Sequence, residues 1–209
     1  MLKKFLGKEK GITGLETAII LIAFVVVAAV FAYTALSAGL FSTQKAQEAI
    51  YSGLREAQST LELKGAVIAT GNSTGDSGEV GEITFTVSNV LGGEPIDFTE
   101  PSGGAAGVAT GNAHKVVINY LDSDQEVDNL YWSVTKLGND DGDSLLEAGE
   151  KFQITVGSQS GEGNLADALV AHPLSVNKTF SLVIMIPFGA VLTIERTTPP
   201  YIDQIINLR

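Results

Sequence analysis

The stretch that decides the fold of this chain is ETAIILIAFVVVAAVFAYTALSAGLFSTQ, residues 16–44. After Glu16 it holds 28 consecutive residues without Asp, Glu, Lys or Arg, and it contains no proline. An apolar helix needs about 20 residues to cross the hydrocarbon core of a bilayer, and only helices and closed barrels satisfy their backbone groups there. The stretch is therefore predicted to be one helix that is long enough to span a membrane.

The residues that follow keep the helical pattern but become amphipathic. Apolar side chains recur at steps of three and four, with Lys, Glu, Gln and Arg between them, at Ala46, Ala49, Ile50, Leu54, Ala57 and Leu61. This spacing predicts a single helix over residues 12–63. A helix that is apolar all round in its first half and on one side in its second half needs two environments, first lipid and then other copies of itself.

Beyond the helix, the period of the apolar residues changes from 3.6 to 2 after Gly65. The alternating runs are predicted strands, seven or eight in all, at residues 66–70, 80–87, 116–120, 130–134, 152–156, 180–186 and 191–193. We therefore expect an α+β fold, in which a long N-terminal hydrophobic α-helix precedes an immunoglobulin-like antiparallel β-sandwich over residues 65–209. The glycine-rich residues 100–111 are expected to form a long surface loop.

Composition limits the partners of the chain. It has 209 residues, no cysteine and a net charge of -11. Residues 1–11 hold four Lys and one Glu, so the remaining chain carries -14. Such a surface repels nucleic acid and anionic lipid headgroups, and the outer domain has to be stable without disulfides.

The N-terminal residues point to a processed precursor. The segment KEKGITGLE, residues 8–16, resembles the class III signal of type IV pilins and archaeal flagellins. The resemblance implies a leader over residues 1–11 that a prepilin-type signal peptidase removes by cutting between Gly11 and Ile12. Counted from Ile12, Gly14 is then third and Glu16 fifth, as in that superfamily. The basic leader orients the precursor with its C-terminal part outside the membrane.

Glu16 has two interpretations. A carboxylate at the edge of an apolar span needs water, a lipid headgroup or a cationic partner. The new amino group of Ile12 on the next subunit is one such partner and would set the axial register. Alternatively, Glu16 is simply favoured by the dipole at the start of the helix.

The resemblance extends through residues 21–48 and returns at residues 186–200, IPFGAVLTIERTTPP, where it is similar to archaeal flagellins. It implies a structural subunit of an archaeal flagellum, which polymerises with copies of itself through the N-terminal helix and serves swimming motility. The subunit would be membrane-inserted as a precursor and become part of an extracellular surface filament. The apolar tail, residues 198–209, is expected to join the contact between copies. The alternatives are an adhesive type IV pilus and a single-span membrane-anchored extracellular binding domain.

One acidic segment resembles a calcium loop. Counted from residue 139, the spacing matches an EF-hand loop at Asn139, Asp141, Asp143, Leu145, Glu147 and Glu150. The glycine stands at position 4 instead of 6, and strands instead of helices are predicted on both sides. A bound Ca²⁺ and a solvated acidic hairpin connection both remain open, and no other cofactor is expected.

Two Asn-X-Ser/Thr triplets lie in the part predicted to be outside, at Asn72 and Asn177. Both are candidate glycosylation sites, and Asn72, in a polar segment, is the better one.

Enzyme activity is not expected. The two histidines, His114 and His172, stand far apart, and neither has a nucleophile or a metal-ligand spacing beside it. The sequence therefore predicts neither catalysis nor a small-molecule substrate.

Overall fold

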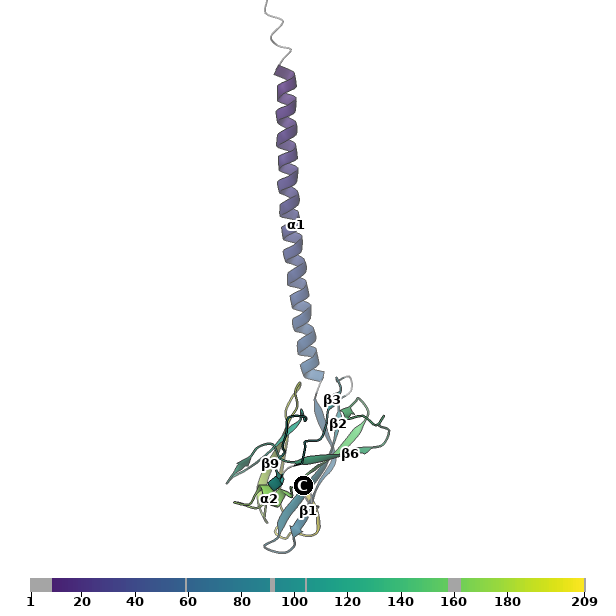
Figure 1. The fold of residues 1–209 in the computed structure, drawn as a ribbon, viewed down its shortest axis with the longest axis vertical. Coiled ribbons are helices and arrows are strands. Elements are labelled where there is room, and N and C mark those ends of the chain that lie inside the picture. The colour runs from purple at the N-terminus through teal and green to yellow at the C-terminus, as the bar shows by residue number, and fades with distance from the viewer. Residues whose placement is uncertain (1–8, 59, 91–92, 104, 158–162, 209) are drawn as a thin grey trace, which may run out of the picture. The chain divides into compact units, whose positions relative to one another are not determined.

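The structure is a computed structural model and describes residues 9–58, 60–90, 93–103, 105–157 and 163–208. It divides into two compact units, Met1–Ser52 and Gly53–Arg209. The described residues of the first all belong to one 50-residue helix, α1 (Glu9–Gln58), drawn in purple to blue in Figure 1. At 1.5 Å per residue α1 is roughly 75 Å long. The predicted long N-terminal helix is confirmed.

The boundaries of α1 differ from the prediction at both ends. It begins at Glu9, so the backbones of Gly11 and Ile12 are helical, while residues 1–8 of the expected leader lie outside the described residues. It ends at Gln58 instead of residue 63, because Leu61 and Leu63 pair with Asn89 and Val87 of a neighbouring strand. Burial of Leu61 in the sheet, at 4% exposure, outweighs the helical spacing of this segment.

The second unit consists of antiparallel sheets. The five-stranded sheet has the order β11-β1-β2-β8-β6, and the four-stranded sheet has the order β10-β9-β4-β5. The strands of the first are β1 (Leu61–Ser73), β2 (Glu79–Asn89), β6 (Trp132–Leu137), β8 (Lys151–Val156) and β11 (Ile205–Leu208). Those of the second are β4 (Val117–Asp122), β5 (Glu126–Val127), β9 (Thr179–Met185) and β10 (Leu192–Thr197). A separate pair joins β3 (Ile96–Asp97) to β7 (Leu145–Leu146).

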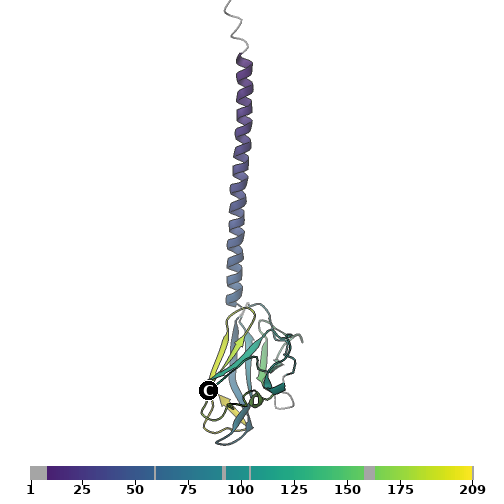
Figure 2. The same cartoon turned by 60° about the vertical axis from the view of Figure 1, so that its left-hand side comes forward.

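Inward-facing residues of both sheets form one hydrophobic core. The strands that carry these residues can be followed in Figures 1 and 2. Its largest fully buried side chains are Trp132, Tyr120, Phe85, Phe98, Phe152 and Phe180. Phe98 meets Trp132 edge-on with ring centroids 5.9 Å apart, and Tyr120 stacks on Phe180 at the same separation. Because all seven predicted runs become strands and the two sheets share this core, the predicted antiparallel sandwich is confirmed.

The C-terminal tail forms a strand that the sequence did not predict. β11 pairs with β1, from Val67 opposite Leu208 to Thr70 opposite Ile205. Ile202 and Leu208 are buried in the core, at 0% and 3% exposure, whereas Ile205 is 71% exposed. Part of the apolar character of residues 198–208 therefore serves the fold of the domain itself, and the expected contact between copies stays a prediction. The strand was not predicted because its alternation is only four residues long.

The glycine-rich segment is also more tightly held than a surface loop. Bridges join Ser102 to Thr110 and Val108 to Leu130, and Ala109 is 7% exposed. A 3₁₀ turn, η1 (Ala105–Gly107), packs beside a short helix, α2 (Leu165–Ala168).

Gly157, next to α2, shows how close this packing is. At φ +86°, a Cβ on Gly157 would lie 2.7 Å from the Gly81 carbonyl oxygen and 2.9 Å from the Leu165 nitrogen.

Candidate functional site

The surface of α1 is the largest apolar feature of the described chain. Its large hydrophobic side chains are between 49% (Leu54) and 74% (Phe24) exposed. Residues 14–54 contain an apolar window with a mean hydropathy of 2.8, of which 0% is buried, and this is one helix long and apolar enough to cross a membrane. Because burying such side chains is favourable by about 1.5–3 kcal/mol each, the surface needs a lipid or protein environment.

The residues of α1 that sequence reasoning singled out lie at its first turns. Gly14 and Glu16 are both exposed, and a Cβ on Gly14 would meet no atom within 4 Å. Gly11 and Ile12 lie within the helical backbone of α1. Since only one copy is present, pairing of Glu16 with the amino group of a neighbouring Ile12 stays a prediction.

Gly14, Gly39 and Gly53 of α1 have no close neighbours among the described residues. A Cβ on Gly39 or Gly53 would also meet nothing within 4 Å. Small residues allow helices to approach closely in apolar surroundings, and the alanines of the central part, at residues 28, 29, 32, 35 and 38, provide further small positions. The helix is therefore suited to contact with other helices.

The acidic loop is built around backbone hydrogen bonds. The Oδ1 atoms of Asp141 and Asp143 accept from the backbone nitrogens two residues later, at 3.1 and 2.7 Å. Glu150, 9% exposed, accepts from the Glu147 nitrogen at 3.0 Å. Among the described residues, no group of three or more His, Asp or Glu side chains is placed to hold a metal ion. The acids of this loop are therefore not clustered as a metal site among the described residues, and the calcium hypothesis stays a prediction.

Replacing both Asp141 and Asp143 with Asn tests that hypothesis by thermal unfolding. An amide oxygen can accept the same backbone hydrogen bonds, so in chelator we expect a change within about 0.5 kcal/mol. If the loop binds Ca²⁺, an excess of 100 Kd stabilises the unaltered chain by about 2.7 kcal/mol, and the double variant loses this gain. Identical unfolding curves of the unaltered chain with and without Ca²⁺ would contradict the hypothesis.

The two sequons occupy different settings. Asn72 lies in β1, and its Oδ1 accepts a hydrogen bond from Asn164 Nδ2 at 2.9 Å. Asn177 lies in an exposed turn before β9, at φ +53°, and its backbone nitrogen donates to the Pro199 carbonyl at 3.2 Å. Asn72 and Asn177 are both exposed, one in a strand and the other on a turn, so both stay predicted glycosylation sites.

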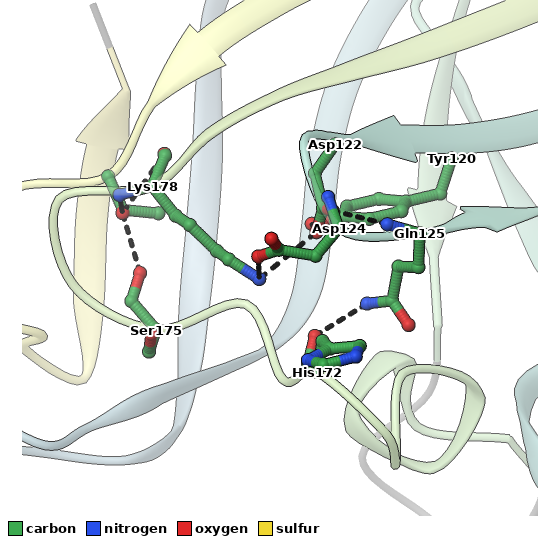
Figure 3. A network of polar contacts seen from close by, with 8 residues as sticks. Tyr120, Asp122, Asp124, Gln125, His172, Ser175 and Lys178 are labelled. Carbon is green, nitrogen blue, oxygen red and sulfur yellow. Dashed lines mark hydrogen bonds and ion pairs between the residues drawn. The ribbon is translucent and has the colours of Figure 1, made fainter.

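A buried polar network holds one end of the four-stranded sheet together (Figure 3). The Tyr120 hydroxyl donates to Asp122 Oδ2 at 2.7 Å. Asp122, with a side-chain exposure of 0%, also accepts from the Asp124 and Gln125 nitrogens at 2.7 and 2.9 Å. Lys178 Nζ lies 3.3 Å from Asp122 Oδ2 and 3.0 Å from Asp124 Oδ2.

The same network reaches the ends of two other segments. The Thr198 hydroxyl donates to the Ser175 carbonyl at 2.6 Å and accepts from the Lys178 nitrogen at 2.8 Å. Gln125 Nε2 donates to the His172 carbonyl at 2.5 Å. The turn between β4 and β5 is thereby tied to the segment before β9 and to the end of β10, so the network is structural.

Burial and the polar contacts of the network shift the pKa values of its groups. Burial alone would raise the pKa of Asp122, but hydrogen bonds from Asp124, Tyr120, Gln125 and Lys178 lower it to about 2. Burial lowers the pKa of Lys178, and its contacts with Asp124 and Asp122 outweigh this and raise it. Burial raises the pKa of Tyr120, and Asp122 raises it further. All three groups therefore keep one charge state from weakly acidic to weakly basic pH.

Asp122→Asn is expected to change the acid stability of the domain. Because the folded pKa of Asp122 lies below its unfolded value, its stabilisation is present above the unfolded pKa and is lost as pH falls through the folded one. This amounts to about 2 kcal/mol between about pH 4 and pH 2. Urea unfolding of the full chain in detergent, followed by the fluorescence of Trp132, should show this slope in the unaltered chain and a flatter one in the variant. Equal slopes would contradict the role of Asp122.

Sequence reasoning did not find this network. Asp122 and Lys178 are separated by 56 residues along the chain, so no local pattern joins them. The one local signal is the polar DSDQ of residues 122–125, which marks a turn but not its partner.

Comparisons with known proteins agree on one family. A family model described as archaeal-type flagellin matches residues 11–196. Probable flagellin 1 of Archaeoglobus fulgidus is 37% identical over 210 residues, covering 98% of each chain. Probable flagellin 1 of Aeropyrum pernix is 34% identical, covering 92% of this chain and 93% of its own.

Solved structures agree as well. A chain of the archaeal flagellum of Methanospirillum hungatei superposes with a TM-score of 0.61 at 29% identity, covering 93% of this chain and 98% of that one. A crystal structure of a Methanocaldococcus jannaschii archaeal flagellin superposes with a TM-score of 0.51 at 12% identity, covering 71% and 95%, which concerns the fold alone.

Proposed function

Because this chain belongs to the archaeal-type flagellin family and is a structural subunit of an archaeal flagellar filament, we propose that α1 drives its assembly after a class III leader is removed. The family is one of structural proteins and not of enzymes. The observation that carries the proposal is the surface of α1, where large apolar side chains over residues 15–54 are at least 49% exposed. Helices of neighbouring copies would cover them in the filament.

Membrane and filament are two successive environments for the same surface. Before assembly, lipid covers the apolar half of α1, and its length suffices for a span. On assembly, neighbouring helices replace lipid, and the gain comes from close packing, because lipid chains are as apolar as the side chains. Small residues and the glycines Gly14 and Gly39 favour that packing. The amphipathic half, beyond Gln44, would lie where the core of the filament meets its outer domains.

Processing is proposed between Gly11 and Ile12 by a prepilin-type signal peptidase. The match to the family model begins at residue 11, at the proposed cut. The cut removes the four lysines of residues 1–11 and leaves the apolar part of α1 in the mature subunit. It also frees an amino group at Ile12, which is the proposed partner of Glu16 on the next copy.

The second unit, Gly53–Arg209, would form the outer wall of the filament and is called the outer unit below. Its net negative charge supports a setting in contact with the medium. Glycans are proposed on Asn72 and Asn177, because both residues are exposed. Swimming motility follows from the family, with torque supplied by a separate motor.

N-terminal sequencing and intact-mass measurement of filaments sheared from the cell surface test this proposal. We expect the mature subunit to start at Ile12. We also expect its mass to exceed that of the polypeptide, and this excess to disappear when Asn72→Gln and Asn177→Gln are combined. Replacing Gly11 with a bulky residue should leave an uncut precursor in the membrane. A start at Met1, or one beyond Gly39, would contradict the proposed processing, and normal filaments from the Gly11 variant would do the same.

A further inference from the structure

The outward face of the five-stranded sheet carries little net charge. Side chains of a strand alternate between the two faces of its sheet, so the outward residues are those between the buried ones. One row crosses all five strands through paired positions and contains no charged residue: Asn207, Ile68, Thr84, Thr155 and Ser133. We call this row and the outward residues beside it the neutral face.

Charges on the neutral face largely cancel. Next to the row, Glu62 and Lys64 of β1 form an ion pair at 2.8 Å, and the other outward charges on these strands are Glu79, Glu82 and Lys151. Three acids therefore face two lysines, a net charge of -1, in a chain that carries -14 outside its first 11 residues.

The opposite side of the sandwich differs. On the outward face of the four-stranded sheet, the row through Leu121 and Ser181 ends in Glu126 on one side and Glu195 on the other. Among the described strand residues that share this face, none is Lys or Arg. Asn177, one of the two glycosylation candidates, precedes β9 of this sheet. Like charge opposes contact there, and a glycan on Asn177 would do the same.

The side chains of the neutral face are also suited to burial. Thr84 and Thr155 are half-buried, with their Oγ1 atoms 3.4 Å apart. Short hydroxyl side chains lose less rotamer freedom on burial than Lys, Glu or Gln. At the edge, Ile205 is 71% exposed and lies opposite Thr70 on the same face. The cores of protein interfaces are likewise depleted in charged residues.

Copies of this chain repel one another wherever carboxylates of one copy face carboxylates of another. In a filament they must nevertheless touch, and of the two outward sheet faces the neutral face has an uncharged central row and both signs of charge beside it, whereas the other has acids alone. We propose that the neutral face is a contact surface for a second copy of this chain in the filament. An open helical polymer requires contacts between two different surfaces, so the neutral face packs on another surface of the next copy. This inference rests on the proposed function.

Charge insertion tests the proposal in cells that make the full chain. Thr84→Glu places a carboxylate at the centre of the row, and Thr193→Glu places one on the outward face of the other sheet as a matched control. Weakening a contact by 1.4 kcal/mol lowers its equilibrium constant about tenfold. We therefore expect about a tenfold loss of sedimentable filament for Thr84→Glu and no more than about a twofold loss for Thr193→Glu. Equal amounts from both variants would overturn the proposal.

Site-directed cross-linking keeps the proposal testable if Thr84→Glu folds poorly. The chain has no cysteine, so Thr84→Cys and Thr193→Cys carry single, specific thiols. Labelled with a short photoreactive maleimide, Thr84→Cys filaments should give covalent dimers and higher species, and mass spectrometry should find the partner residue in another copy. Labelling of a different protein, or cross-links confined to one chain, would overturn the proposal.

The outcomes separate this inference from the proposed function. If filaments form through α1 but the two Thr84 variants behave like their Thr193 controls, the neutral face alone is ruled out. If charges in the apolar half of α1 leave filaments intact, the proposed function itself fails.

Discussion

Val27→Asp is expected to abolish filament formation while leaving the outer domain folded. Val27 lies in the middle of the apolar half of α1 and is 52% exposed in the single subunit. In the assembled filament this side chain would be covered by neighbouring helices. A buried and unpaired carboxylate costs several kcal/mol, and a loss of about 3 kcal/mol per subunit lowers an association constant more than about 100-fold. Electron microscopy and sedimentation of sheared material should therefore find no filament.

Two controls make this result specific. Val27→Leu keeps the site apolar and should assemble normally. The outer unit, Gly53–Arg209, is compact by itself, so its unfolding temperature, reported by Trp132, should be equal in both variants. Because a central charge also raises the cost of membrane insertion by about 2.5–3.5 kcal/mol, the amount of membrane-bound subunit must be measured alongside. Filaments of normal yield from Val27→Asp would rule out burial of this helix surface.

Gly157→Ala is expected to cause the largest loss of stability in the outer domain. Gly157 has a φ of +86°, and an added Cβ would lie 2.7 Å from the Gly81 oxygen and 2.9 Å from the Leu165 nitrogen. Both contacts are to backbone atoms, which cannot turn away. The variant must therefore displace β2 or α2 in addition to bearing the strain of a positive φ. We expect a loss of about 3 kcal/mol, which lowers the melting temperature by about 10 °C.

Gly138→Ala separates the two contributions. Gly138 has the same φ of +86°, but a Cβ there would meet nothing within 4 Å. Its substitution therefore measures the conformational strain alone, about 1–2 kcal/mol. The difference between the two variants is then the cost of the close approach at Gly157. Equal losses in both would show that the backbone of α2 gives way without cost.

The features found from sequence are those that repeat at short range. The apolar run after Glu16 and the alternation in segments such as residues 80–87 and 180–186 each carry their own periodicity, so the helix and the main strands were predicted. The helix end was misplaced because Ala57 and Leu61 fit a helical step, whereas the pairing of Leu61 with Asn89 depends on a distant strand.

The site was predicted only in part, for a similar reason. Exposure of the apolar surface of α1 follows from composition, since a single helix cannot bury such a run. The network of Asp122 and Lys178 was not found, because it joins segments brought together by the sheet. The acidic spacing from Asn139 to Glu150 resembles a calcium loop, yet in the structure Asp141 and Asp143 accept hydrogen bonds from their own loop.

The pairing of β11 with β1 also governs when a subunit is finished. β1 is the first strand of the outer domain and β11 the last, and their partners, such as Val67 and Leu208, stand at opposite ends of that domain in sequence. The sheet therefore cannot close until residues 205–208 have left the ribosome and reached the compartment where the domain folds. Contacts of such long sequence separation slow folding, and a chain shortened before Ile205 keeps the edge of β1 open for pairing with other chains. The arrival of residues 205–208 is thus a requirement for a closed sheet.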